Sequence, residues 1–140
     1  LCGANSGALF LSLPVATCGV SLASGSPISY GSLNPGETSA EQTLVLDNTG
    51  SSPATLNVQG SQWHDSFLVN QMDVSQTHFN TVGASTYSSK TPLSTSIQSI
   101  TSAFSPTENL NTYWQVLAYP ANQSFTGLLQ QEMTFTVSCQ

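Results

Sequence analysis

Arginine is absent from this chain, and Lys90 is its single lysine. Seven acidic residues set a formal net charge of −6, and charged residues make up only 6% of the sequence. Proteins that bind nucleic acid need several cationic side chains to neutralise phosphates, so the composition argues against nucleic acid as a partner. Attraction to anionic lipid headgroups is disfavoured for the same reason.

The sequence also lacks a long uninterrupted apolar run. Residues 8–23 are the most apolar stretch, but Pro14, Gly19 and several hydroxyl residues interrupt it, and it is short for a membrane span. It has no basic flank of the kind that precedes the apolar core of a signal peptide. We therefore expect no membrane span, and we expect Leu1 to begin a mature chain from which a signal peptide has been removed.

Cysteine is scarce, and the three cysteines lie near the chain ends as Cys2, Cys18 and Cys139. None has metal-ligand spacing to another cysteine or histidine, which argues against a metal site. In an exported protein two of them would pair, and Cys18–Cys139 is favoured because both lie on expected terminal strands. Cys2 would then stay unpaired or bond another subunit. A Cys2–Cys18 bridge, or three free thiols in a reducing compartment, are the alternatives.

Hydroxyl side chains are what the sequence has in abundance, since 23 serines and 16 threonines make up 39 of its 140 residues. Aromatic and β-branched residues, recurring between Gly, Pro and Asn turn signals, argue against disorder. With no long helix expected, the pattern indicates an all-β fold, a single β-sandwich. The expected centre of the core is formed by Trp114, Val116, Phe135 and Val137.

The turn signals divide the chain into expected strands. These span residues 19–23, 28–33, 41–47, 54–58, 111–119 and 127–139. Asn48-Thr49-Gly50 lies between the third and fourth, so we expect these two to form a hairpin. Phe67, Leu68 and Val69 are expected to join the core. Residues 70–108 are expected to form short strands joined by loops.

A strongly apolar period-2 pattern begins the chain. Leu9, Leu11, Leu13 and Val15 alternate with smaller or polar residues and with Phe10, which is typical of a strand with one apolar face. Such a strand must be covered. It either belongs to the sandwich of its own chain or completes the sheet of a neighbouring molecule. We expect the second arrangement, with residues 1–18 as an extension carrying a donor strand and residues 19–140 as the sandwich domain.

Five short motifs follow one another along the chain: ISYGSLNPG at 28–36, LDNTG at 46–50, TPLST at 91–95, YWQV at 113–116 and MTFTV at 133–137. Each motif is unspecific by itself, and their order is more specific than any one of them. In this order the chain resembles the immunoglobulin-like β-sandwich modules of archaeal surface proteins, and the single-domain subunits of archaeal extracellular threads and bundling pili. The likeness covers about residues 28–139. It implies an immunoglobulin-like sandwich of jelly-roll or Greek-key type and an extracellular, cell-surface location.

The resemblance also implies an assembly. In the thread and pilus families an N-terminal strand inserts into a groove of the next subunit, and residues 8–16 occupy the matching position here. We therefore expect a non-enzymatic structural subunit whose partner is a further copy of itself, without a cofactor. The alternative is a monomeric cell-surface adhesin or carbohydrate-binding module that uses Trp63. Other cells or surfaces are further expected partners.

Other candidate sites carry weaker signals. His64, Asp65 and His78 offer the residue types of a serine hydrolase, but serine is too abundant to be informative and no Gly-x-Ser-x-Gly elbow is present; we expect them in exposed loops near Trp63. The acidic residues are too dispersed for a calcium loop. Asn122 begins a glycosylation sequon, Asn-Gln-Ser. Lys90 lies in a polar stretch that predicts a solvated loop, which argues against an isopeptide bond.

Overall fold

The computed structural model describes residues 15–118 and 127–140 and is all-β. A five-stranded sheet has the order β1-β2-β9-β6-β7, and its pairings are antiparallel. Its strands are β1 (Val20–Ser24), β2 (Gln42–Asn48), β6 (Thr77–Asn80), β7 (Thr91–Pro92) and β9 (Asn109–Val116).

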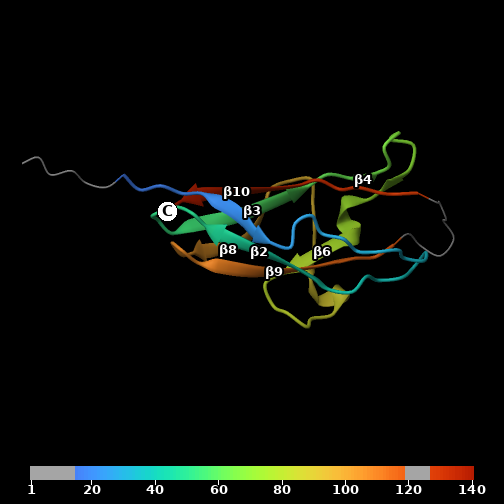
Figure 1. The fold of residues 1–140 in the computed structure, drawn as a ribbon, viewed down its shortest axis with the longest axis horizontal. Helices are drawn as coiled ribbons and strands as arrows, with labels where there is room; N and C mark the ends of the chain where they lie inside the picture. The colour runs from blue at the N-terminus through green and yellow to red at the C-terminus, as the bar shows by residue number, and fades with distance from the viewer. Residues whose placement is uncertain (1–14, 119–126) are drawn as a thin grey trace, which may run out of the picture.

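A second, three-stranded antiparallel sheet has the order β10-β3-β8. It consists of β3 (Ala54–Gly60), β8 (Gln98–Phe104) and β10 (Met133–Cys139). A small hairpin, β4 (Trp63–His64) with β5 (Gln71–Met72), projects from one end, and two single 3-10 turns, η1 (Val74–Gln76) and η2 (Tyr87–Ser89), complete the described elements. The two larger sheets lie one over the other (Figure 1).

The core fills the space between the two sheets because their strands alternate buried and less buried positions. Leu44 and Leu46 of β2 face Leu56 and Val58 of β3, and all four are almost completely buried. Trp114 of β9 lies at the centre, stacked on Phe79 and edge-on to Phe135. The expectation that Trp114 lies at the centre of the core is confirmed. Val116 is buried but lies outside the main cluster, and Phe135 and Val137 are half-buried against it.

The expected hairpin of residues 41–47 with 54–58 is wrong, because β2 and β3 belong to different sheets. Each strand presents one fully apolar face, and two such faces cover each other better from opposite sheets than side by side in one. Asn48 holds the connection: its Nδ2 donates to the carbonyls of Ser52 (3.2 Å) and Phe104 (2.8 Å), and its Oδ1 accepts from Gly50 N (2.8 Å).

Two further expectations about strands are corrected. Residues 28–33 form no strand: Gly31 has a φ of 74°, outside the range of extended backbone, and the segment runs on to the turn at residues 34–37. The expected strand over 127–139 is shorter, because regular pairing with β3 begins only at Met133. The strands expected at 19–23, 41–47, 54–58 and 111–119 correspond to β1, β2, β3 and β9 with shifted ends.

Candidate functional site

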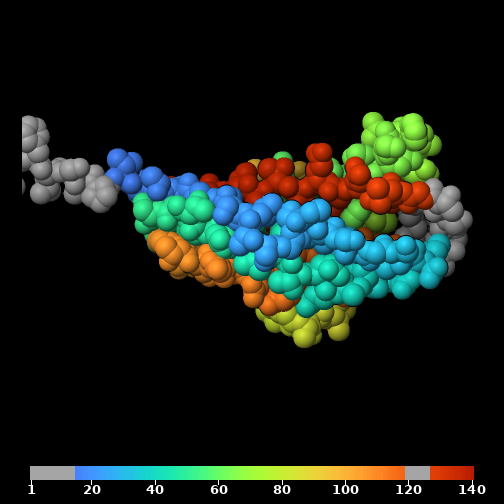
Figure 2. Space-filling model, viewed as in Figure 1, coloured from blue at the N-terminus to red at the C-terminus, as the bar shows by residue number. Residues whose placement is uncertain are grey.

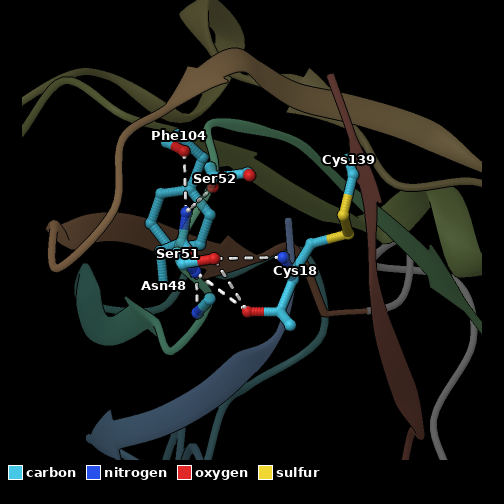
Figure 3. Close-up of a disulfide and its surroundings, with 8 residues drawn as sticks. Cys18, Asn48, Ser51, Ser52, Phe104 and Cys139 are labelled. Atoms are coloured by element: carbon cyan, nitrogen blue, oxygen red, sulfur yellow. Dashed lines mark hydrogen bonds between the residues drawn. A yellow bond between two sulfur atoms is a disulfide. The ribbon is translucent and has the colours of Figure 1, made fainter. Parts of the chain in front are cut away.

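The sandwich carries a disulfide at the point where the N-terminal segment joins it. Cys18 is bonded to Cys139 at the end of β10, with their Cα atoms 5.4 Å apart (Figure 3). This is the pairing that the sequence favoured. Thr17 is held as well, since its carbonyl accepts hydrogen bonds from Ser51 N (3.0 Å) and Ser52 N (3.1 Å). The backbone is therefore fixed to the sandwich at Thr17 and Cys18.

Five residues were singled out for the expected donor strand, and the structure describes one of them, Val15. Its side chain is 82% exposed. Leu9, Phe10, Leu11 and Leu13 lie outside the described residues, as does Cys2. The sequon asparagine Asn122 lies outside them too. Their roles therefore stay predictions.

One side of the molecule, between β1 and β10, is incompletely paired. We call it the open side. The disulfide joins β10 to the start of β1 at one end, but β1 ends at Ser24 and residues 28–33 continue without a backbone hydrogen bond to any strand in the described chain. β10 pairs only with β3, so its other edge is unpaired within residues 15–118 and 127–140. An unpaired edge is a template for a further strand.

A cavity of about 730 Å³ lies at the far end of the open side. Its lining is mostly apolar and includes Ile28, Tyr30, Leu33, Trp63, Met72 and Leu128. Tyr30 and Trp63 are in edge-to-face contact, with ring centroids 5.9 Å apart. The Tyr30 hydroxyl is buried and has no hydrogen-bond partner among the residues that the structure describes, and burial raises the pKa of that phenol. A cavity whose walls are partly apolar and carry a few polar groups is suited to a partly apolar occupant.

The cavity and the disulfide lie at opposite ends of the molecule. Figure 1 shows the C-terminus and the first described residues at the left, and the β4 hairpin with residues 28–36 at the right. The described chain thus begins at the end that holds the disulfide, while segments that line the cavity lie toward the other end.

The loop that joins β4 to β5 corrects a sequence expectation. Phe67, Leu68 and Val69, expected in the core, are 83%, 62% and 78% exposed. They form the tip of the hairpin, which we call the apolar knob. The prediction was wrong because these residues lie at the tip of a six-residue loop, where their side chains have no other part of the described chain to pack against.

Asp65 organises this loop. Its carboxylate accepts hydrogen bonds from the backbone N–H groups of Phe67 (3.1 Å), Val69 (2.9 Å) and Asn70 (3.2 Å), and from the Asn70 side chain (2.7 Å). Desolvation raises the pKa of Asp65, but these hydrogen bonds outweigh it and lower the pKa overall. Asp65 is therefore a structural acceptor within the loop.

Lys90 is not in a solvated loop, contrary to expectation. Its side chain is fully buried, and its Nζ donates to Glu41 Oε2 (2.7 Å) and to the carbonyl (2.7 Å) and hydroxyl (2.8 Å) of Ser85. These three bonds use all the donors of the ammonium group. The hydrogen bond from Lys90 is the main cause that lowers the pKa of Glu41.

The two histidines lie on different strands, and each imidazole contacts a backbone carbonyl. His64 lies on β4 and His78 on β6, and both are half-buried, not exposed in loops as expected. The Nδ1 of His78 lies 2.9 Å from the carbonyl of Tyr87, whose ring stacks on it, and the Nδ1 of His64 lies 3.0 Å from the carbonyl of Asp65. No hydrogen bond joins either imidazole to a serine hydroxyl in the part of the chain described.

Two negative findings concern the described residues alone. They contain no group of three His, Cys, Asp or Glu side chains placed to hold a metal ion. They also contain no helix that is both long and apolar enough to cross a membrane.

Sequence reasoning missed the cavity and the apolar knob. The cavity is built from segments far apart in the chain, 28–35, Trp63, Met72 and 127–129, so no local pattern indicates it. The knob had one local signal, Asp65 itself, because aspartate side chains in turns accept a hydrogen bond from the backbone two residues on, as Asp65 does from Phe67. Comparison with known proteins adds no assignment, because neither a protein-family model nor a curated protein sequence matches this chain.

Proposed function

We propose that this chain is a structural subunit of an extracellular filament, a thread or pilus, and that it polymerises head-to-tail. The N-terminal strand, residues 8–16, inserts into the sandwich of the adjacent subunit. The sandwich is immunoglobulin-like and lacks one strand, which the neighbour supplies. The observation that carries this proposal is the open side, where one edge of β10 has no partner among the described strands and a partly apolar cavity lies at the far end.

The placement of the two ends supports head-to-tail assembly. A strand that leaves beside Cys18 can reach the cavity end of a second copy, while that copy's own strand leaves from its opposite end. Contacts between two different patches propagate instead of closing into a dimer. The disulfide favours an oxidising, extracellular location.

The chemistry of the acceptor also suits a strand. β10 alternates half-buried Met133, Phe135 and Val137 with exposed Thr134, Thr136 and Ser138. A strand added along its free edge would gain backbone hydrogen bonds, and its apolar face would extend this half-buried row. Burial of Leu9, Leu11, Leu13 and Val15 contributes roughly 1.5–3 kcal/mol each before entropy costs.

The proposal predicts that replacing Leu9, Leu11 and Leu13 together by serine abolishes filaments and leaves a folded monomer. The three apolar groups that would anchor the strand are lost, while the sandwich keeps its core. Negative-stain microscopy with analytical ultracentrifugation measures the outcome.

The matched control is Ala8→Ser with Ser12→Thr, which alters the other face of the same strand and should leave filaments intact. Deletion of residues 1–17 should give the same monomer as the triple variant. Filaments that persist in either case would overturn the proposal.

A monomeric carbohydrate-binding module is the second candidate, because the Trp63 and Tyr30 rings meet in the cavity wall. A glycan array decides between the two. Specific binding by a monomer, lost in Trp63→Ala, supports the module; a silent array with filaments present supports the structural subunit.

A further inference from the structure

The apolar knob is held in one conformation at an energetic cost. Leu68 has a φ of 58°, in the left-handed region that residues other than glycine and asparagine rarely adopt. Three consecutive large apolar side chains are also kept in water. The four hydrogen bonds to the Asp65 carboxylate over-determine the loop and hold it in this state. A strained, rigid and apolar loop tip points to a contact surface.

The scarcity of charged residues in the apolar knob limits the kinds of partner that it can bind. The one acidic side chain in the loop, Asp65, is engaged with the loop's own N–H groups, and the one cation of the chain, Lys90, is buried elsewhere. The knob therefore has no cationic residue that would attract an anionic lipid headgroup or another anionic partner. Its partner must itself be apolar at the contact.

The position of the knob indicates which apolar surface it meets. Trp63 and Met72, the outer positions of the same hairpin, line the cavity, so the knob projects beside the cavity end (Figure 2, light green at the upper right). Val15, the first residue described at the opposite end of the molecule, is 82% exposed, and Leu22, farther along in β1, is 50% exposed. Apolar surface is thus offered at both ends of one chain.

We propose that the apolar knob docks against the segment 15–22 of a second copy of this chain, where that copy's N-terminal strand enters the cavity. This inference rests on the proposed function and adds a second contact to it. An incoming strand of residues 8–16 carries Val15 close to the entrance, which the knob borders. The knob acts as a rigid stop that fixes the angle between successive subunits.

Photo-crosslinking in the full-length protein tests the contact directly. p-Benzoyl-phenylalanine replaces Phe67, and the same group at Val82, an exposed residue of the β6–β7 connection, is the control. Irradiated filaments are digested and crosslinked peptides are identified by mass spectrometry. Crosslinks from position 67 to residues 15–22 of another chain are expected; crosslinks exclusively to other regions, or none, overturn the inference.

Substitution gives an independent measurement. Phe67→Ser with Val69→Ser should raise the critical concentration for polymerisation on the order of tenfold, as expected for the loss of an apolar anchor. Val82→Ser should leave it unchanged, and both variants should melt at the temperature of the parent monomer. An unchanged critical concentration in the knob variant overturns the inference.

The outcomes separate the inference from the function on which it rests. If the parent protein forms no filaments, or forms them without its N-terminal strand, the proposed function fails. If filaments depend on that strand while the knob variant assembles normally and instead loses binding to vesicles of neutral phosphatidylcholine, only the inference fails and the knob is a membrane contact.

Discussion

Removal of the Cys18–Cys139 disulfide should lower the free energy of unfolding by about 4–5 kcal/mol, because the bond closes a very long loop of the unfolded chain. The two cysteines are 121 residues apart, and the chain-entropy contribution grows with the logarithm of that separation. For a domain of this size the expected fall in melting temperature is on the order of 15 °C. Denaturant unfolding of Cys18→Ala/Cys139→Ala measures the loss.

The matched control is Cys2→Ser, which removes a thiol without opening the Cys18–Cys139 loop. It should leave the unfolding midpoint of the isolated monomer unchanged. A double variant that loses less than about 1 kcal/mol would contradict the entropic account and would mean that the bond is strained or that the unfolded chain is already compact.

The same bond has a mechanical consequence for a filament. Tension on the N-terminal strand enters the sandwich at Thr17 and Cys18, and the disulfide transfers part of it to β10, the strand that we propose as the acceptor edge. Hydrogen exchange at β1 should therefore speed up on reduction, because the covalent anchor at Cys18 is lost and β1 is then held chiefly by its pairing with β2. Unchanged protection at β1 would show that the bond does not anchor this strand.

What the sequence predicted well were features with a local pattern. Alternation over residues 133–137 and the Trp114–Val116 pair indicated both strands and their buried faces. Local alternation did not predict which strands pair with each other. The sequence of β2 and β3 is typical of a hairpin, yet the two strands belong to different sheets and cover each other across the core. Register and partner choice depend on long-range packing, which local alternation does not encode.

The hydropathy of the neighbouring sequence predicted the wrong burial at two residues: one expected in solvent is buried, and one expected in the core is exposed. Lys90, surrounded in sequence by serine and threonine, is buried because Glu41 and Ser85 satisfy its three donors. Phe67, inside an apolar run, is exposed because Asp65 and Asn70 close the loop beneath it. In both cases a residue distant in sequence, or a side-chain hydrogen bond to backbone, overrides the hydropathy of the neighbourhood.

The ion pair of Lys90 with Glu41 should be the second large contributor to stability. Glu41→Gln leaves a fully buried ammonium without a counter-charge, and we expect it to lower the free energy of unfolding by about 2–4 kcal/mol. Glu132→Gln is the matched control, because Glu132 is exposed and its carboxylate makes no hydrogen bond to any described residue; it should change stability by less than about 0.5 kcal/mol. Chemical denaturation of the monomers measures both.

A double-mutant cycle distinguishes the pair from general packing. Lys90→Met in the parent should also destabilise, but in the Glu41→Gln background it should cost far less, because there it removes a buried ammonium that has already lost its counter-charge. A coupling energy on the order of 2 kcal/mol is expected. Additive effects of the two substitutions would show that the ion pair, as such, contributes nothing.

The pH dependence of stability follows from the same contact. The pKa of Glu41 is lower in the folded protein than in the unfolded chain, chiefly because Lys90 donates a hydrogen bond to its carboxylate. The unfolded state therefore binds protons more readily, so the contribution of Glu41 is present above the unfolded pKa, near about 4.3, and is lost as pH falls through the lower folded value. Unfolding curves from pH 7 to pH 2.5 should show a smaller loss of the free energy of unfolding at acid pH in Glu41→Gln than in the parent.

The remaining loss would belong to Asp65 and Asp73, whose pKa values are also lowered. Equal slopes in the two proteins would contradict the assignment of this acid sensitivity to the Lys90–Glu41 pair.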